Sequence, residues 1–493
     1  MAHSPAITRR WPPAPTCAMM VASSQTEEAI IMITRIASIL DDLRPCFSRQ
    51  AAFEWFVIMI FGLIIRCDHL GITSIVRWLF LSPDCYDLIL HFFRATSWQL
   101  DSLLAQWAQV ALHHYPLIPF AGRALVLGDG IKVGKEARRM PAVKTLHQDS
   151  DNSSKAPYIR GHHFGFVGLL VGSLSKAFCL PLRAQLHEGT EGLRSDLGWN
   201  GQPATVVTRM AHLVVSCAQQ MGCSCYVALD AYFATGPAFG IFQAALNDLG
   251  QPWVHLITRA KDNYVAYFDW GETQPKFQDK DKFDVMSIFR SPDVFEEAEV
   301  MIYGEYKKVA YYCANFLWKP VKGRIRFVWV MDGDHHYVLM CSDLQLCPTQ
   351  IIAIYSYRWK IEVMFFALKH WLGGFCYHFW TKAVPKFKRG ETLDATTCSP
   401  EARQQLAQTL DTIERFVNLA GIALGLLQYL ALIHGAQIWQ TYCGWLRTYS
   451  SSVPSEAVVQ SVVRAEFFSL ASKVPDCRTL EILLEKSIRR PYT

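Results

Sequence analysis

The chain has 493 residues, of which 51% are hydrophobic and 18% are charged, so a broadly disordered protein is excluded and a large core is expected. The 48 Lys and Arg exceed the 43 Asp and Glu by a net charge of only +5, which is compatible with a nucleic-acid partner but does not establish one. The 15 Cys are scattered and residues 1–20 contain no apolar signal-peptide segment, so we expect a cytoplasmic protein with reduced thiols.

The first quarter of the chain is predicted to be helical after a short tail. Residues 1–25 are rich in Pro, Ser and Ala without periodicity, which is typical of a disordered tail. Residues 26–120 repeat apolar residues at helical spacing in five segments: 27–45, 49–66, 74–82, 84–95 and 97–113. Five arginines lie among the apolar positions: Arg35, Arg44, Arg66, Arg77 and Arg94. Such a region is consistent with DNA binding, although an ordinary helical bundle shows the same pattern.

Residues 121–259 are predicted to form an α/β core. The apolar run 124–129 is typical of a buried strand that ends on Asp129, and the run 225–230 of a second one that ends on Asp230. The other elements expected in this part are strands at 162–173, 177–185 and 253–259, helices at 203–221 and 236–249, and a polar loop at 135–160. This order of strands and helices indicates a mixed sheet with helices packed on it.

Residues 260–347 interrupt the alternation of strands and helices. They are rich in Tyr, Val, Phe and Trp, so we expect an inserted β subdomain with strands at 299–303, 306–317, 324–331 and 336–342. Helical periodicity returns in 348–375, with a predicted helix at 349–372. The region 376–493 begins with a polar connection and is expected to be helical from 401 to 490.

Two apolar stretches approach the length of a membrane span. The stretch 53–65 is too short and contains Glu54, and the stretch 416–433 contains Asn418 and Gln428. We therefore expect both to be helices of a buried core or of an oligomer contact, and we expect no membrane association.

The segment after Pro348 carries an unusual set of charges. Tyr355, Arg358, Glu362 and Lys369 stand at i, i+3, i+7 and i+14 with no Gly or Pro among them, so a helix would present them on one face. A solvated charged face is the ordinary explanation of such a pattern, and a turn or helix cap is the ordinary role of an Asp after a strand.

The combination of three carboxylates favours a metal site. Asp129 and Asp230 are expected at the edge of the sheet where the strands end, and Glu362 on a helix that can pack against it. Carboxylate oxygens are the ligands that Mg²⁺ prefers, and Mn²⁺ accepts the same donors. Two such ions about 4 Å apart are suited to cleaving phosphodiesters.

The spacing of Tyr355, Arg358, Glu362 and Lys369 resembles the signature of DDE transposases of the insertion-sequence-four type. The run Asp230-Ala-Tyr-Phe233 is similar to the second acidic motif of that family, and Asp129 after an apolar strand to the first. The resemblance covers about residues 120–375. It implies an RNase H-like mixed-sheet core with an inserted β subdomain, flanked by N- and C-terminal helical regions. It also implies that Asp129, Asp230 and Glu362 are the catalytic and metal-binding residues.

The same resemblance implies that the substrate is double-stranded DNA. A transposase of a bacterial insertion sequence would bind the inverted repeats at the ends of its element, cleave there and join the freed 3′ ends to target DNA, working as a homodimer. The helices of 26–120 would bind the DNA ends, and the region 376–493 would suit dimerisation. A base flipped at the end would stack on a tryptophan of the β insertion, for which Trp270, Trp318 and Trp329 are the candidates.

Six residues are expected to contact DNA: Tyr355, Arg358, Lys369, Lys132, Arg259 and Lys261. The first three belong to the family signature, and the others follow predicted strands at the same edge of the sheet. Lys135, Arg138 and Arg139 are weaker candidates near Lys132. Two other functions remain open, since an inactive or domesticated DNA-binding descendant, or a nuclease without strand transfer, would carry similar sequence features.

Overall fold

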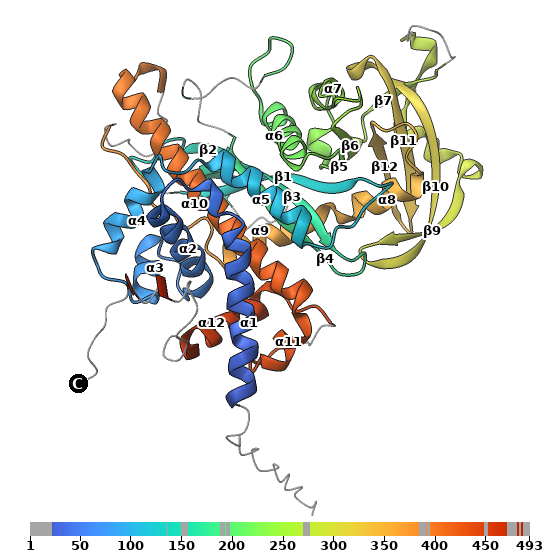
Figure 1. Ribbon diagram of the computed structural model, residues 1–493. Helices are drawn as coiled ribbons and strands as arrows, with labels where there is room; N and C mark the ends of the chain where they lie inside the picture. Colours follow the sequence, from blue (N-terminus) through green and yellow to red (C-terminus); the bar gives the residue numbers. More distant parts are fainter. Residues whose placement is uncertain are drawn as a thin grey trace, which may run out of the picture.

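The structure is a computed structural model in which one large sheet is surrounded by helices (Figure 1). It describes residues 22–135, 137–148, 156–187, 193, 198–269, 277–383, 391, 395–447, 452–470, 481–482 and 485–486. Most of the tail expected at 1–25 lies outside these residues, and Ala22 already belongs to the first helix.

The described residues contain twelve strands, which belong to one mixed sheet with the order β2-β3-β1-β5-β6-β12-β11-β10-β7-β8, while β4 pairs with β3 and β9 with β10. Their bounds are β1 Ala124–Gly134, β2 Lys144–His147, β3 Tyr158–Gly172, β4 Ala177–Leu186, β5 Cys225–Ala228, β6 Val254–Arg259, β7 Val265–Tyr267, β8 Lys282–Asp284, β9 Glu296–Ile302, β10 Glu305–Trp318, β11 Gly323–Asp332 and β12 His335–Cys341. The prediction of a mixed α/β sheet is therefore confirmed.

The helices of the described residues pack on both faces of the sheet and at its end. Their bounds are α1 Ala22–Asp41, α2 Gln50–Ile65, α3 Ile72–Trp78, α4 Cys85–Arg94, α5 Leu100–His114, α6 Val206–Met221, α7 Gly236–Ala244, α8 Pro348–Ser356, α9 Lys360–His370, α10 Pro400–Ile433, α11 Gly435–Thr441 and α12 Glu456–Leu470. The ends of α6 follow from its sequence, because Thr205 forms a capping box with Thr208 and Gly222 ends the helix in a left-handed conformation.

The strands around β1 set the position of the candidate site. β1 runs antiparallel to β3 and parallel to β5, and β5 is parallel to β6. In Figure 1, α6 and α7 lie on one side of these strands and α8 and α9 on the other. The buried side chains of both layers join in one core, in which Leu125, Val126 and Leu127 of β1 are inaccessible to solvent.

The strands of 260–347 extend the core sheet instead of forming a separate one. The four predicted strands are present as β9 to β12, and β12 pairs antiparallel with β6 of the core. The sheet is therefore continuous from the core into the lobe that contains β7 to β12, on the right of Figure 1.

In two segments the secondary structure differs in kind from the prediction. The helix expected at 349–372 is broken into α8 and α9 by a 3₁₀ turn, Tyr357–Trp359. The break has a tertiary cause, since Tyr357 is buried and its hydroxyl donates to the carbonyl oxygen of Leu174 at 2.6 Å. The polar loop expected at 135–160 contains the short strand β2, which pairs with the start of β3.

The long helix α10 covers the free edge of strand β4. Asn418 bonds both backbone groups of Ala184, at 2.8 and 2.9 Å, and the backbone N–H of Leu186 donates to Glu414 at 2.7 Å. Gln428 donates to the carbonyl oxygen of Cys179 at 3.2 Å. The polar residues of this apolar helix thus satisfy the strand edge, which would otherwise expose unpaired groups.

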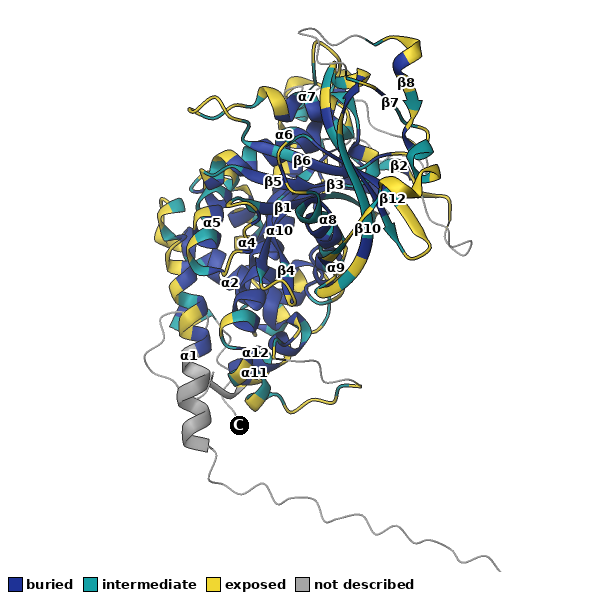
Figure 2. Ribbon diagram, turned by 90° about the vertical axis from the view of Figure 1, so that its right-hand side faces the viewer, coloured by how far each residue is buried: buried dark blue, intermediate teal, exposed yellow. Residues whose placement is uncertain are grey.

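The apolar part of α10 lies inside the molecule. By length and composition, α10 could cross a membrane, but 89% of its most apolar window is buried in the protein. Figure 2 shows this helix in the colour of buried residues along most of its length. The stretch 416–433, expected as an oligomer contact or core helix, is therefore a core helix, and a dimer would have to form through another surface.

Candidate active site of three carboxylates and an arginine

Asp129 lies in the middle of a strand, and the prediction that its strand ends there is wrong. β1 continues to Gly134, where it still pairs with Gly161 of β3. Its parallel neighbour β5 stops earlier, and the last pair between them is Leu127 with Ala228. Because β1 loses one neighbour just before Asp129, the side of the strand at this residue opens to the loops that leave β5.

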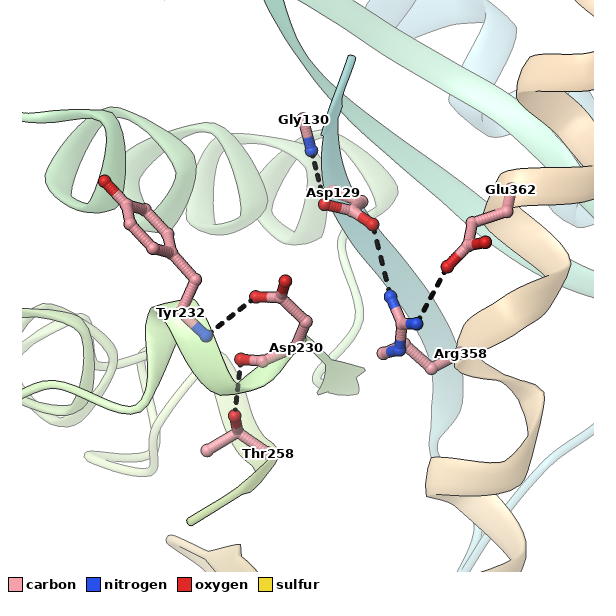
Figure 3. A network of polar contacts seen from close by, with 7 residues as sticks. All are labelled: Asp129, Gly130, Asp230, Tyr232, Thr258, Arg358 and Glu362. Carbon is pink, nitrogen blue, oxygen red and sulfur yellow. Dashed lines mark hydrogen bonds and ion pairs between the residues drawn. The ribbon is translucent and has the colours of Figure 1, made fainter. Parts of the chain in front are cut away.

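Asp230 follows β5 by two residues and is held by its own backbone surroundings. Its side chain accepts a hydrogen bond from the backbone N–H of Tyr232 at 3.0 Å and caps the 3₁₀ turn Ala231–Phe233. Its carbonyl oxygen accepts a bond of 2.7 Å from the buried hydroxyl of Thr258 on β6. These contacts fix the residue so that its carboxylate points towards Asp129 (Figure 3).

Arg358 joins two of the three carboxylates. Its Nη1 donates to Oδ2 of Asp129 at 3.2 Å, and its Nη2 donates to Oε1 of Glu362 at 2.8 Å. Arg358 comes from the 3₁₀ turn between α8 and α9, and Glu362 from the first turn of α9. Figure 3 shows the guanidinium between these two carboxylates, with Asp230 on the other side of Asp129.

Negative charge is only partly compensated in this site. Burial, together with the charge of Asp230, raises the pKa of Asp129 to about 7, although Arg358 and the N–H of Gly130 act in the opposite direction. Burial also raises the pKa of Asp230, against the effect of Arg358. The two aspartates are thus held close together in partly buried positions that disfavour their ionised forms.

The surroundings of the site also shift the pKa values of Arg358 and Tyr355. Burial alone would lower the pKa of Arg358, but the charges of Asp129 and Glu362 raise it, so the guanidinium stays charged. Burial raises the pKa of Tyr355 to about 12, with the charge of Asp230 adding to the effect and that of Arg358 opposing it. Tyr355 therefore keeps its hydroxyl proton as a possible donor.

The donor set fits a hard divalent cation such as Mg²⁺ or Mn²⁺. Asp129, Asp230 and Glu362 offer only oxygen ligands, and the raised pKa values of the two aspartates indicate that additional positive charge would stabilise them. Within the described residues, no three His, Cys, Asp or Glu side chains are already grouped around one ion position. Arg358 lies between Asp129 and Glu362 and donates to both, so Glu362 would be available as a third ligand only after this bridge opened.

The other residues expected to contact DNA are divided between the site and its surroundings. Arg259 ends β6 with its guanidinium over the ring of Tyr337, 5.9 Å from the ring centre, and Lys261 is exposed two residues later. Lys369 is exposed two turns beyond Glu362 on α9. Lys132 follows Asp129 by an odd number of residues, so its side chain leaves the opposite face of β1, and it donates to the carbonyl oxygen of His147 at 2.7 Å.

Several of the weaker candidates for a contact with DNA are buried in the protein. Lys135 is buried, donates to the carbonyl oxygens of Phe375 and Tyr377, and lies 3.8 Å from the centre of the Tyr377 ring. Trp318 and Trp329 are core residues with exposures of 3% and 0%, so neither presents a surface for a flipped base. Trp270 lies outside the described residues. Lys135 and the two tryptophans are therefore core residues of this structure and do not belong to an exposed surface.

Two residues near the site were not singled out from the sequence. Thr258 donates a hydrogen bond to the carbonyl oxygen of Asp230. The only feature of the sequence that could have indicated this role is a hydroxyl residue near the end of an apolar strand. Tyr337 lies beneath Arg259 and is placed there by the pairing of β12 with β6, which the sequence does not reveal. Both act on residues of the site through contacts between segments that are distant in the chain.

Comparison of the sequence with protein-family models and with curated proteins found no match.

Proposed function

We propose that the chain is a DDE-type transposase of a bacterial insertion sequence, which cleaves double-stranded DNA at the ends of its element and joins the ends to target DNA. The observation that carries the proposal is the convergence of Asp129, Asp230 and Glu362, from three distant segments, around Arg358 of the same signature. The strand order β4-β3-β1-β5-β6, with β1, β5 and β6 parallel, supports the RNase H-like core that the resemblance implies.

Each residue of the site has a defined part in this chemistry. Asp129, Asp230 and Glu362 would hold Mg²⁺, which when bound activates the attacking oxygen and stabilises the leaving oxygen of a phosphodiester. Arg358 can donate two parallel hydrogen bonds to a phosphate, as it now does to two carboxylates. Tyr355 can donate its hydroxyl proton to the DNA backbone or pack against it, because it stays neutral near pH 7.

The two reactions balance without an external energy source. In cleavage, water adds to the phosphorus, the bond to the 3′ oxygen breaks, and the element is left with a 3′ hydroxyl. In joining, this hydroxyl adds to a target phosphorus and displaces the target's own 3′ oxygen. The joining step exchanges one phosphodiester for another, so the protein needs to position the strands and stabilise charge.

The DNA would extend from the carboxylates over the surrounding cations. Arg259 is the last residue of β6, Lys261 follows it by two residues, and Lys369 lies further along α9. Lys132 would contact DNA only on the opposite face of β1. We assign recognition of the inverted repeats to the helices of 26–120 and propose that two copies act together on paired ends.

A Mg²⁺-dependent cleavage assay tests the proposal. The substrate is DNA that carries the inverted repeats flanking the coding region, and the variant is Glu362→Gln, which keeps the size of the side chain and removes its charge. We expect cleavage at the repeat ends by the wild type and a loss of roughly three orders of magnitude or more in the variant. Retention of a gel shift by the variant would show that DNA binding survives.

Glu297→Gln is the matched control, since Glu297 is also an exposed glutamate with a cationic partner, Lys308 at 2.6 Å. It should cleave like the wild type. Cleavage by Glu362→Gln at the wild-type rate would contradict the assignment. A gel shift by the wild type without cleavage would favour an inactive DNA-binding descendant, and cleavage without joining would favour a nuclease.

A further inference from the structure

The bridge formed by Arg358 has a consequence for the metal site, and this inference rests on the proposed function. The guanidinium spans Asp129 on β1 and Glu362 on α9, with N–O distances of 3.2 and 2.8 Å. Its side chain is only 21% exposed, so the bridge is not a loose surface contact. It links two of the three carboxylates that would have to share the metal.

The guanidinium and a metal ion need the same oxygens. Oδ2 of Asp129 and Oε1 of Glu362 cannot be free ligands while they accept hydrogen bonds from Arg358. A second cation between them would also be repelled by the fixed charge of the guanidinium. Because arginine does not lose its proton in proteins, this charge can leave the site only if the side chain moves.

A DNA phosphate offers Arg358 an equivalent partner. A phosphate accepts two parallel hydrogen bonds from one guanidinium, as a pair of carboxylate oxygens does. Glu362 has a side chain that is 59% exposed, so the bridge borders the solvent from which DNA would approach. Transfer of the guanidinium to a phosphate would release both carboxylates at the moment when the substrate arrives.

We propose that Arg358 is an internal cation that keeps metal ions out of the free protein until a DNA phosphate replaces Asp129 and Glu362 as its partner. Binding of the metal and binding of DNA then support each other, and the coupling has to be the same in both directions. A free protein that binds metal weakly would also have little capacity to cleave DNA that is not seated in the site.

The first test measures Mn²⁺ binding to the full chain without DNA, by the electron paramagnetic resonance signal of the free ion. We expect Arg358→Gln to bind Mn²⁺ about tenfold more tightly than the wild type, within the range usual for coupled sites. Arg358→Lys should be intermediate, because one ammonium group cannot span both carboxylates in the same way. Equal affinity of the wild type and Arg358→Gln would overturn the inference.

Arg259→Gln is the matched control. It removes an arginine at the same edge of the sheet whose guanidinium lies over Tyr337 and is not part of the bridge. Its Mn²⁺ affinity should stay within about twofold of the wild type, since the oxygens of Asp129 and Glu362 in the bridge are occupied by Arg358 and not by Arg259. If Arg259→Gln gained as much Mn²⁺ affinity as Arg358→Gln, the loss of one positive charge would explain both gains, and the proposal would be contradicted.

The second test adds DNA and does not depend on the folding of a variant. The probe is a duplex of the inverted repeat that is already trimmed to its end and lacks the terminal 3′ hydroxyl, so neither cleavage nor joining occurs. The duplex should raise the Mn²⁺ affinity of the wild type by about the same factor as Arg358→Gln does. An unchanged affinity would overturn the inference.

Failure of the inference can be told apart from failure of the proposed function. If Asp129→Asn removes Mn²⁺ binding but Arg358 and DNA have no influence on it, the metal site stands and only the role of Arg358 is wrong. If Asp129→Asn binds Mn²⁺ like the wild type, the carboxylates are not the metal site and both proposals fall.

Discussion

Asp129 lies within β1 and Asp343 follows the end of β12 in the same sheet, but their surroundings act on their charges in opposite ways. Burial raises the pKa of Asp129 to about 7. Burial has the same tendency at Asp343, but the N–H of Gln345 and the hydroxyl of Tyr226, at 3.0 and 2.9 Å, lower its pKa. The charge of Asp343 therefore stabilises the fold, whereas the charge of Asp129 opposes it, as is common for functional groups.

We predict that Asp129→Asn stabilises the metal-free protein at pH 8 by roughly 1 to 3 kcal/mol, while it abolishes cleavage. The gain should shrink as the pH falls from about 7 towards 4, because the wild-type carboxylate then takes up a proton in the folded state. Its raised pKa means that the folded state holds this proton where the unfolded state has lost it. Urea unfolding in the presence of EDTA measures both effects.

Asp343→Asn is the comparison for this experiment. It should destabilise the protein by about 1 kcal/mol, because a hydrogen bond to a charged group is weakened. If Asp129→Asn loses as much stability as Asp343→Asn, the carboxylate of Asp129 is a structural group and its role in the site is in doubt.

The residues of the site could be identified from the sequence, but their contacts with one another could not. The spacing of Arg358 and Glu362 indicated that they share a face, and the structure confirms that they touch. The bond from Arg358 to Asp129 joins residues 229 positions apart, and no local pattern encodes it. Arg66 shows the opposite case, since it was grouped with arginines that could contact DNA but is fully buried.

At the scale of the elements, the end of helix α9 is tied to both helical regions. Arg66, just after α2, donates to the carbonyl oxygens of Gly71, Leu372 and Gly373 at 2.9, 2.6 and 3.0 Å. Gln460 of α12 donates to the carbonyl oxygen of Trp371 at 3.0 Å. These bonds satisfy backbone groups beyond the helix that carries Glu362, so the flanking helices help to fix its position.

We predict that Arg66→Ala destabilises the protein by roughly 3 kcal/mol or more, because it leaves buried carbonyl oxygens unpaired and a cavity behind. Arg77→Ala is the control, since Arg77 forms an exposed pair with Asp68 at 3.3 Å and should cost no more than about 1 kcal/mol. Urea unfolding compares the two variants. Equal small losses would show that the tie contributes nothing to stability.

Most elements could be predicted from periodicity, but their boundaries depended on distant partners. The segment around β1 illustrates this, because the apolar run predicts a strand end at Asp129 although pairing with β3 continues to Gly134. The break between α8 and α9 contains no Gly or Pro and results from the packing of Tyr357. An apolar pattern predicts that a segment is buried. Where a strand ends or a helix breaks depends in addition on the segments that pack against it.

For the molecule as a whole, the part that carries the candidate site is not expected to fold by itself. Residues 121–375 contain the three carboxylates and Arg358, but the free edge and part of the face of β4 are covered by α10. We predict that the fragment 121–375 aggregates when it is produced alone, because an exposed apolar strand edge pairs with other chains. Size-exclusion chromatography of the soluble fraction is the measurement.

Addition of residues 400–470 as a second chain should recover soluble complex, since these residues contain α10, α11 and α12. A monomeric, folded fragment 121–375 would contradict the prediction and would show that the core can close without the C-terminal helices.

Because α10 follows β4 in the chain, the edge of β4 stays uncovered during part of the synthesis of the protein. Ala184 is synthesised 234 residues before its partner Asn418. At a synthesis rate of about 5 to 20 residues per second, roughly 10 to 50 s pass between synthesis of the strand and synthesis of the helix that covers its edge. Chaperones that shield apolar strands would have their greatest effect in this interval, and the yield of folded protein should depend on them more than its final stability suggests.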